Sequence, residues 1–367
     1  MIRDSHQSLT IKLRRSPENI VLLSPGLNEE TIWGETLAVR SEAKYLAKEF
    51  PGATIHKFGI EHLDRIRAMK VDLLISFFTG PRPPWRIDNI AEMVEGVTIL
   101  KVVNHADLLD EFARIRVDGY ITNSIAAAVM FDKIRPSAYI PLAVEDDYGP
   151  VAPQDRYRAD VVFLGSGGRG NKRPATTQRY LQAAKKFDFA IWGSDWSRDY
   201  WESEYTSNPE ANDWHLFCRG QLPIDDIAAL YCSAKIVLNF HEDSQRECGM
   251  WNNRTFEALG CGAFMICDEA KGLREEFGEA IVFTSGGEET ARLIAHYLER
   301  PEERRRIGRL GAQIVRERYL YSRYASAVHQ LYDRIIDEKS RAKVIAMSAD
   351  SERLSSVSDL KSSEKTP

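Results

Sequence analysis

The sequence predicts an α/β protein with two Rossmann-like domains facing a central cleft, followed by C-terminal helices and a disordered tail. Its 367 residues are more than one hydrophobic core usually serves. From residue 20, short apolar and β-branched runs alternate with longer amphipathic stretches, which is typical of βαβ units around a parallel sheet. The alternation lapses once, at residues 146–159, and then resumes. The pattern therefore predicts two similar domains and one linker.

The first domain is assigned to residues 1–145. Its apolar runs predict strands at 20–24, 53–57, 71–78, 97–103, 117–122 and 138–142. A helical stretch after the first strand places Trp33, Leu37, Tyr45 and Leu46 on one side, which predicts a core-facing surface. Turn residues and charges fill the linker, 146–159.

The second domain is assigned to residues 160–320. Strands are predicted at 160–164, 187–192, 235–240, 263–267 and 280–283, and helices at 288–298 and 301–316. A last helix, 321–339, carries Tyr324, Val328, Leu331 and Ile335 at helical spacing, so one of its faces should be buried. Serines and charges replace most apolar residues over 340–367, which predicts a disordered tail.

Composition and charge indicate which partners and which compartment to expect. The net charge is -5 and the cations are spread along the chain, so nucleic acid is not an expected partner. The five cysteines lack C-x-x-C spacing, which predicts reduced thiols rather than disulfides or a zinc cluster. No apolar run is long enough to span a bilayer, and we expect a cytoplasmic protein. A peripheral contact with a membrane is compatible with this composition.

The segment richest in candidate chemistry is Asn252-Asn253-Arg254-Thr255-Phe256-Glu257. Asn253 is suited to cap a short helix, whose free N–H groups, together with Arg254, could bind a diphosphate. Thr255 lies in the same first turn. Glu257, one turn later, offers two acceptor oxygens for the vicinal hydroxyls of a ribose. The alternative is an ordinary capped helix with both charged side chains in solvent.

A second candidate is the glycine-rich basic loop after the strand 160–164. It contains Gly165, Ser166, Arg169, Lys172 and Arg173, and such a loop can wrap a phosphate. Its order of residues is not that of a P-loop, and a solvated basic turn is the alternative. Gly193 and Gln221 are predicted to follow strands of the same domain, where their backbone groups could line a base pocket.

Two candidates come from the first domain. His105 and Asp107 follow the strand 97–103, where they could orient a sugar or act as acid or base. A lone histidine at a strand end is more often structural. The loop after the first strand would approach the cleft from the acceptor side, with Gly26 and Asn28 near the acceptor and Glu29 as a candidate base. Its alternative is a solvated acidic helix start.

The order of these pieces resembles a known family. The strand 234–239, Gly249, the Arg-x-Phe-Glu run at 254–257 and the turn and strand start at 261–264 follow one another as in the donor-binding segment of GT-B glycosyltransferases. The segment is most similar to the CgeB-like, spore-maturation-type group, classed near glycosyltransferase group 1. The resemblance covers about residues 160–332, whereas the first domain is similar only in general layout.

The resemblance implies transfer of a sugar from a nucleoside diphosphate, UDP or GDP, without a metal or other cofactor. Glu257 would bind the ribose, and Arg254 and the basic loop the diphosphate. The acceptor is open: a glycan, a lipid-linked sugar, a protein or a small molecule. Many retaining relatives carry a second glutamate eight residues before the first, and here that position is Gly249. An epimerase or hydrolase, or a silent nucleotide-sugar-binding protein, is the alternative reading.

Overall fold

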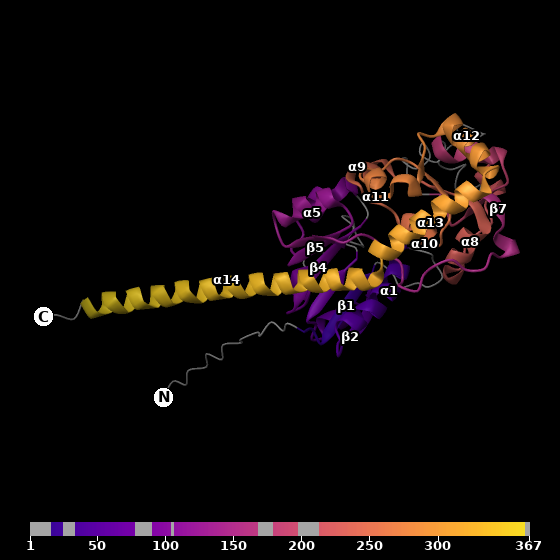
Figure 1. Ribbon diagram of the computed structural model, residues 1–367. Helices are drawn as coiled ribbons and strands as arrows, with labels where there is room; N and C mark the ends of the chain where they lie inside the picture. Colours follow the sequence, from indigo (N-terminus) through magenta and orange to yellow (C-terminus); the bar gives the residue numbers. More distant parts are fainter. Residues whose placement is uncertain are drawn as a thin grey trace.

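The protein forms two α/β domains, each around one parallel sheet, in a computed structural model that describes residues 16–24, 34–77, 90–103, 106–167, 179–196 and 213–363 (Figure 1). This confirms the fold class that the sequence predicts. The six and five strands observed correspond one to one with the runs predicted as strands. Their ends differ by a few residues, as is usual for boundaries.

The first sheet has the strand order β2-β1-β3-β4-β5-β6, and all its pairs are parallel. Residues of β1, β3, β4 and β5 are almost all buried, because helices cover both faces of the sheet. The strands are β1 (Asn19–Ser24), β2 (Thr54–Gly59), β3 (Leu73–Ser76), β4 (Val97–Val102), β5 (Gly119–Thr122) and β6 (Ser137–Tyr139). The helices are α1 (Gly34–Glu49), α2 (Leu63–Arg67), α3 (Ile90–Met93), α4 (Leu109–Phe112) and α5 (Ile125–Asp132).

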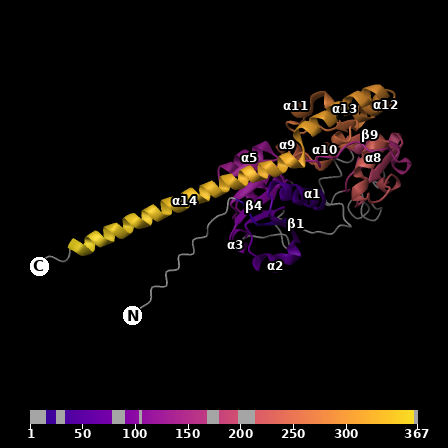
Figure 2. The same cartoon turned by 60° about the horizontal axis from the view of Figure 1, so that its bottom comes forward.

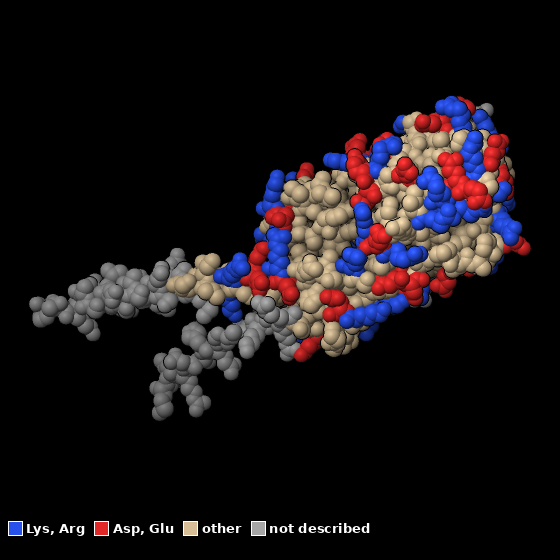
Figure 3. All heavy atoms as spheres, in the orientation of Figure 1, with Lys and Arg blue, Asp and Glu red and all other residues tan. Residues whose placement is uncertain are grey.

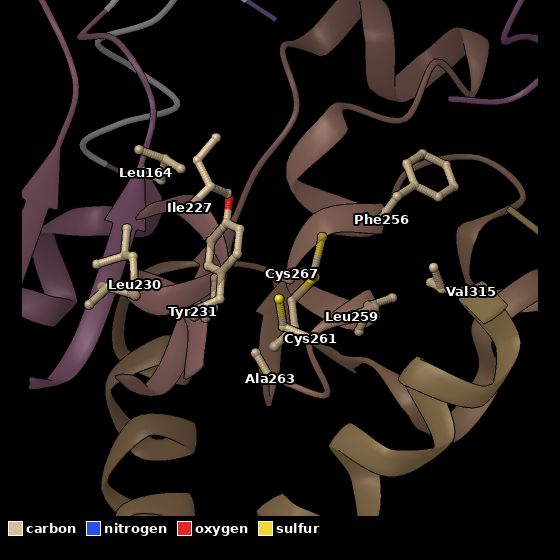
Figure 4. Packing of buried hydrophobic residues seen from close by; sticks show 14 of the residues in the cluster. Leu164, Ile227, Leu230, Tyr231, Phe256, Leu259, Cys261, Ala263, Cys267 and Val315 are labelled. Atoms are coloured by element: carbon tan, nitrogen blue, oxygen red, sulfur yellow. The ribbon is translucent and has the colours of Figure 1, made fainter. Parts of the chain in front are cut away.

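The second sheet has the order β11-β10-β9-β7-β8 and is also parallel. Its central strands, β7 and β9, are mostly apolar, and their buried residues lie between two clusters of side chains, one of which Figure 4 shows. The strands are β7 (Ala159–Leu164), β8 (Phe189–Trp192), β9 (Ala234–Asn239), β10 (Met265–Cys267) and β11 (Val282–Phe283). The helices are α8 (Ile227–Ser233), α9 (Asp243–Cys248), α10 (Asn253–Gly260), α11 (Leu273–Phe277), α12 (Gly287–Leu298) and α13 (Pro301–Arg318).

The last helix, α14 (Tyr321–Ser363), returns to the first domain. Its predicted buried face is confirmed: Tyr324, Val328, Leu331 and Ile335 are at most 3% exposed and pack with residues of α1 and the first sheet. The chain crosses between the domains beside its own linker, where the Val144 N–H donates to the Tyr319 carbonyl and the Tyr321 N–H to the Val144 carbonyl, both at 2.9 Å. Helical spacing predicts the buried face but not which domain it covers.

The tail differs from the prediction. Residues predicted as disordered continue α14 as far as Ser363, and the helix leaves the body of the protein (Figures 1 and 2). Residues 341–345 are exposed. A helix that is already nucleated by packing needs only one favourable residue at a time to extend, and Arg341, Ala342 and Lys343 are good helix formers. Although α14 is long, none of the described helices is apolar enough over sufficient length to cross a bilayer.

A buried ion pair holds the first domain together beneath α14. Lys101 of β4 donates to Glu42 of α1, and these residues are 2% and 0% exposed. The ammonium also lies 4.4 Å from the ring centre of Phe77 and 4.7 Å from that of Tyr324. Burial raises the pKa of Glu42, and the charge of Lys101 opposes this shift. The pair therefore links α1, β4 and α14 at one point.

Candidate functional site

Backbone hydrogen bonds at the carboxyl ends of β7 and β8 join the residues that follow β7, the end of β8 with the residues after it, and Gly220. Gly165 donates to the Trp192 carbonyl, Gly167 to Ser194, and Gly193 to Gly220, each at 2.9 Å. These bonds bring together three residues predicted for the donor site, Gly165, Ser166 and Gly193. Gln221 follows Gly220 and is exposed. The edge at which parallel strands end is where open α/β sheets bind ligands.

Side chains at two of these glycines would make close contacts. Gly193 has a φ of +140°, and a Cβ there would lie 2.2 Å from the Gly165 carbonyl oxygen. A Cβ on Gly165 would lie 2.5 Å from Nη2 of Arg254. The backbone at Gly165 therefore lies close to the Arg254 guanidinium, and position 193 requires glycine because a backbone carbonyl lies next to it.

Helix α10 begins at this same edge, and its cap differs by one residue from the prediction. The Asn252 side chain, not that of Asn253, accepts a hydrogen bond from the Thr255 N–H at 3.2 Å. Asn253 is instead the first helical residue. A cap needs extended backbone geometry, which Asn252 has with φ -80° and ψ 165°. Two adjacent asparagines do not reveal in sequence which of them takes that conformation.

Asn239, the last residue of β9, joins this cap to the sheet. Its Nδ2 donates to Oγ1 of Thr255 at 2.8 Å, and its Oδ1 accepts from Asn252 at 2.9 Å and from Nη1 of Arg254 at 2.7 Å. Asn239 is fully buried. The sequence analysis did not predict this role, although an asparagine at the end of a mostly apolar strand could have indicated it.

Arg254 is held between β7 and β9. Besides the bond to Asn239, its Nε donates to the Leu164 carbonyl, and its guanidinium carbon lies 4.3 Å from the ring centre of Phe163. These contacts fix a positive charge beside the N-terminus of α10, where the helix dipole is also positive. The edge of the sheet is therefore electrostatically suited to an anion.

Glu257 lies one turn further along α10 and is half-buried. The Tyr231 hydroxyl, from α8, donates to its Oε2 at 3.4 Å. Burial raises the pKa of Glu257 to about 7, while the charge of Arg254 and the bond from Tyr231 oppose the shift. A carboxyl with this pKa changes charge near neutral pH, which makes it a candidate functional group.

Gly249 stands where many relatives of the fold have glutamate, and the structure gives it a backbone role. It is the C-cap of α9, with φ +68° and an N–H that donates to the Gln245 carbonyl. A Cβ would lie 2.8 Å from the Lys271 carbonyl oxygen. Of the nearby acids, Glu242 caps the start of α9, whereas Asp243 pairs with Arg246 at 2.7 Å. A glutamate at position 249 would be strained in this backbone.

Replacing Gly249 with alanine should lower the free energy of unfolding by about 1–3 kcal/mol, because positive φ and the close carbonyl both oppose a side chain. Urea unfolding would measure the loss. Gly149→Ala is the matched control, since a Cβ there meets no atom within 4 Å and its φ is not positive. Equal stability of the two variants would contradict the backbone role.

The loops at the carboxyl ends of the two sheets meet. After β5, Asn123 donates to the Trp251 carbonyl at 3.1 Å and the Ser124 hydroxyl to the Cys248 carbonyl at 2.5 Å. Met250 is buried among side chains of the first domain. The turn η2 (Ala106–Leu108), which holds the exposed Asp107, packs near α9. Asp107 therefore lies on the side of the first domain that faces the second.

The other predicted site residues cannot be placed. They lie outside the described residues: Gly26, Asn28, Glu29, His105, Arg169, Lys172 and Arg173. Their roles stay predictions.

A buried pair at the ends of β9 and β10 was not predicted. His241 Nδ1 lies 2.7 Å from Asp268 Oδ1, and the His241 N–H donates to Oδ2 of the same carboxylate at 3.0 Å. With Cys267, these residues gather three ligand-type atoms within 4.8 Å. A tetrahedral zinc ion would hold its nitrogen and oxygen ligands about 3.3 Å apart, given metal bonds of about 2.0 Å. The shorter separation is that of a hydrogen bond, which orients the ring.

The second domain matches a family model. Residues 173–330 match the family described as "Glycosyl transferase-like". This stretch contains α9, α10 and most of the second sheet. A search of curated proteins finds no matching sequence.

Several solved structures with a similar fold are glycosyltransferases. Sucrose-phosphate synthase from Thermosynechococcus elongatus is 12% identical with a TM-score of 0.58, over 88% of this chain and 100% of that one. HepE from Anabaena, in complex with UDP and glucose, is 13% identical with a TM-score of 0.58, over 86% and 98% of the chains. A glycosyltransferase from Rickettsia africae is 12% identical with a TM-score of 0.59, over 87% and 98%.

These similarities identify the arrangement of the two domains as the GT-B fold. Fold and family match together indicate an enzyme of the glycosyltransferase class. The resemblance to the CgeB-like group stays a prediction, because neither comparison distinguishes that group.

Proposed function

We propose that this glycosyltransferase transfers a sugar from a nucleoside diphosphate, UDP or GDP, to an acceptor without using a metal. The observation that carries the proposal is the pairing of Arg254 and Glu257 one turn apart at the start of α10, on the carboxyl edge of the sheet. An anion site and a carboxylate at that spacing suit the diphosphate and the ribose of one nucleotide.

The donor would lie along the ends of β7, β8 and β9. Its diphosphate would be at the N-terminus of α10, near Arg254 and the predicted cations of the basic loop. Its ribose would reach Glu257, and its base the backbone around Gly193 and Gln221. The structure of HepE in complex with UDP-glucose, at 13% identity, supports the choice of a uridine nucleotide only as an analogy of fold.

In the reaction, an acceptor oxygen attacks the anomeric carbon of the sugar while the bond from that carbon to the diphosphate breaks. The electron pair leaves with the diphosphate, where the charge of Arg254 and the helix dipole would stabilise it. The acceptor proton passes to a base, for which His105, Asp107 and Glu29 are the candidates from the first domain. Asp107 is the candidate that the structure describes on the side facing α9.

Donor binding should depend on pH through Glu257. Ribose hydroxyls donate to a carboxylate, so the donor binds the charged form of Glu257. The pKa of Glu257 in the free protein is about 7, so below pH 7 this residue must release a proton before the donor binds. Affinity for UDP-glucose should therefore be highest above pH 7 and fall by up to about tenfold for each pH unit below it. Calorimetry at several pH values would measure this, because the diphosphate of UDP-glucose does not itself titrate in this range.

Glu257→Gln should bind more weakly at pH 8 and lose the pH dependence. Glu247→Gln is the control, since Glu247 is exposed on the neighbouring helix. A pH profile unchanged by Glu257→Gln would contradict the ribose role.

Product analysis tests the reaction itself. The protein would be incubated with nucleotide sugars that are radiolabelled in the sugar, together with glycan, lipid-linked, protein and small-molecule acceptors. The proposal expects label in an acceptor product. Free sugar or an epimer, with no acceptor product, would favour a hydrolase or an epimerase. Binding of the donor without any turnover would favour a catalytically inactive binding protein. That alternative is suggested by position 249, which is glycine where many relatives have glutamate.

A further inference from the structure

Two cysteines face each other behind the candidate donor site. Cys232 belongs to α8, and Cys261 is the C-cap of α10. The Cys232 thiol donates to the Cys261 carbonyl oxygen at 3.9 Å, and the Cys261 thiol to the Gly149 carbonyl oxygen at 3.8 Å. All five cysteines are free thiols. The two residues are 29 positions apart in sequence, so no spacing rule could have paired them.

The thiols border a cavity of about 870 Å³ at the amino-terminal edge of the second sheet, where β7 and β9 begin. This edge is opposite the candidate donor site. Cys232 is half-buried, whereas Cys261 is 4% exposed. A small reagent that enters the cavity would therefore meet Cys232 first. The cavity is also lined by four cations and two carboxylates: Arg158, Lys235, Arg304, Arg305, Asp160 and Asp188.

The surroundings make the two thiols unequal. The neighbouring Cys261 thiol lowers the pKa of Cys232 to about 7. Burial opposes the shift, and the Val151 N–H, which donates to the Cys232 sulfur at 3.3 Å, supports it. The neighbouring Cys232, together with burial, raises the pKa of Cys261. One thiol is thus suited to act as nucleophile, and the other stays protonated beside it.

We propose that Cys232 and Cys261 form an oxidative modification site, at which Cys232 reacts with a hydroperoxide and Cys261 then closes a disulfide between α8 and α10. In the first step the Cys232 thiolate attacks a peroxide oxygen, the O–O bond breaks, and the leaving alkoxide or hydroxide takes a proton. In the second, the Cys261 sulfur attacks the sulfenic sulfur, the S–O bond breaks, and water leaves with the Cys261 proton. Two thiols are oxidised and one hydroperoxide is reduced.

The disulfide would affect the donor site from the opposite edge of the second sheet. Tyr231, which donates to Glu257, directly precedes Cys232, and Cys261 directly follows α10. Figure 4 shows Tyr231 and Cys261 in the same cluster of buried side chains. A covalent link between the two elements would shift Tyr231 relative to Glu257. This consequence, unlike the cross-link, rests on the proposed function.

The test treats the full-length protein with hydrogen peroxide at pH 7 and maps its peptides under non-reducing conditions. We expect a Cys232–Cys261 cross-link as the first product. At pH 7 the larger thiolate fraction of Cys232 outweighs its lower intrinsic nucleophilicity, so it should react about three to five times faster than an ordinary thiol. Cys218 and Cys248, both partly exposed, are internal controls.

Two variants separate the oxidation of Cys232 from the closure of the disulfide. In Cys261→Ala, oxidation should stop at a sulfenic acid on Cys232 that dimedone traps, and Cys232→Ser should leave Cys261 reduced. If Cys261→Ala does not fold, Cys261→Ser serves the same purpose. Earlier oxidation of Cys218 or Cys248, or over-oxidation of Cys232 in the unaltered protein without a cross-link, would overturn the proposal. Because mapping needs no nucleotide, its outcome is independent of whether the protein binds a donor.

Discussion

Arg254→Ala is expected to lower the affinity for UDP by about 10- to 100-fold, as expected for the loss of charge-assisted hydrogen bonds to the diphosphate. Affinity for uridine, which has no phosphate, should change much less. Arg254 is fixed at the sheet edge by Leu164 and Asn239, so its charge is already in position before a ligand arrives. Calorimetric titration with UDP and with uridine measures the two effects.

The matched control is Arg318→Ala, which removes an exposed arginine paired with Glu276 on the same domain. It should leave both affinities unchanged. Arg254→Lys keeps the charge but loses the planar donors, and we expect an intermediate loss. If Arg254→Ala weakened uridine and UDP equally, the residue would support the shape of the site rather than bind the phosphate.

Lys101→Met should destabilise the protein by about 3–5 kcal/mol, because it leaves the fully buried Glu42 without its partner. Part of the loss should be recovered in Lys101→Met with Glu42→Leu, since no charge then stays buried. Urea unfolding followed by circular dichroism measures these differences.

The control for the buried pair is Arg67→Met, which breaks an exposed ion pair with Asp64. Exposed pairs contribute about 0–1 kcal/mol, so this variant should be nearly as stable as the unaltered protein. A loss for Lys101→Met no greater than that for Arg67→Met would show that Glu42 is accommodated without its partner. The link between α1, β4 and α14 would then be unimportant for stability.

Local patterns were sufficient to predict the two sheets. Runs such as those ending at Ser24 and Asn239 are apolar because strands of a parallel sheet are buried on both faces, and this property is readable from sequence. The buried face of α14 was readable for the same reason. Its attachment to the first domain was not, because spacing within a helix says nothing about the surface that it meets.

The candidate site was only partly predictable. Arg254 and Glu257 follow from residue type and helical spacing, but the contacts that orient them come from distant segments. Asn239 and Tyr231 reach α10 from 15 and 26 residues away, and Asn123 crosses from the other domain over 128 residues. Gly249 is explained by a left-handed backbone that only the structure shows. Long-range contacts of this kind have no signature in one sequence.

Figure 3 shows acidic and basic side chains interspersed over the face that it presents, rather than gathered by sign. The cations are also spread along the sequence, and the expectation that nucleic acid is not a partner stays a prediction.

The central claim is that the start of α10 binds a nucleoside-diphosphate sugar. The most direct test is thermal unfolding in the presence of UDP, GDP, their sugars and the matching nucleosides. A ligand at 100 times its Kd should stabilise the protein by about 2.7 kcal/mol, which corresponds to an increase in Tm of several degrees. We predict this increase for at least one nucleoside diphosphate or its sugar, and a smaller one in Glu257→Ala. No increase with any of them would contradict the account.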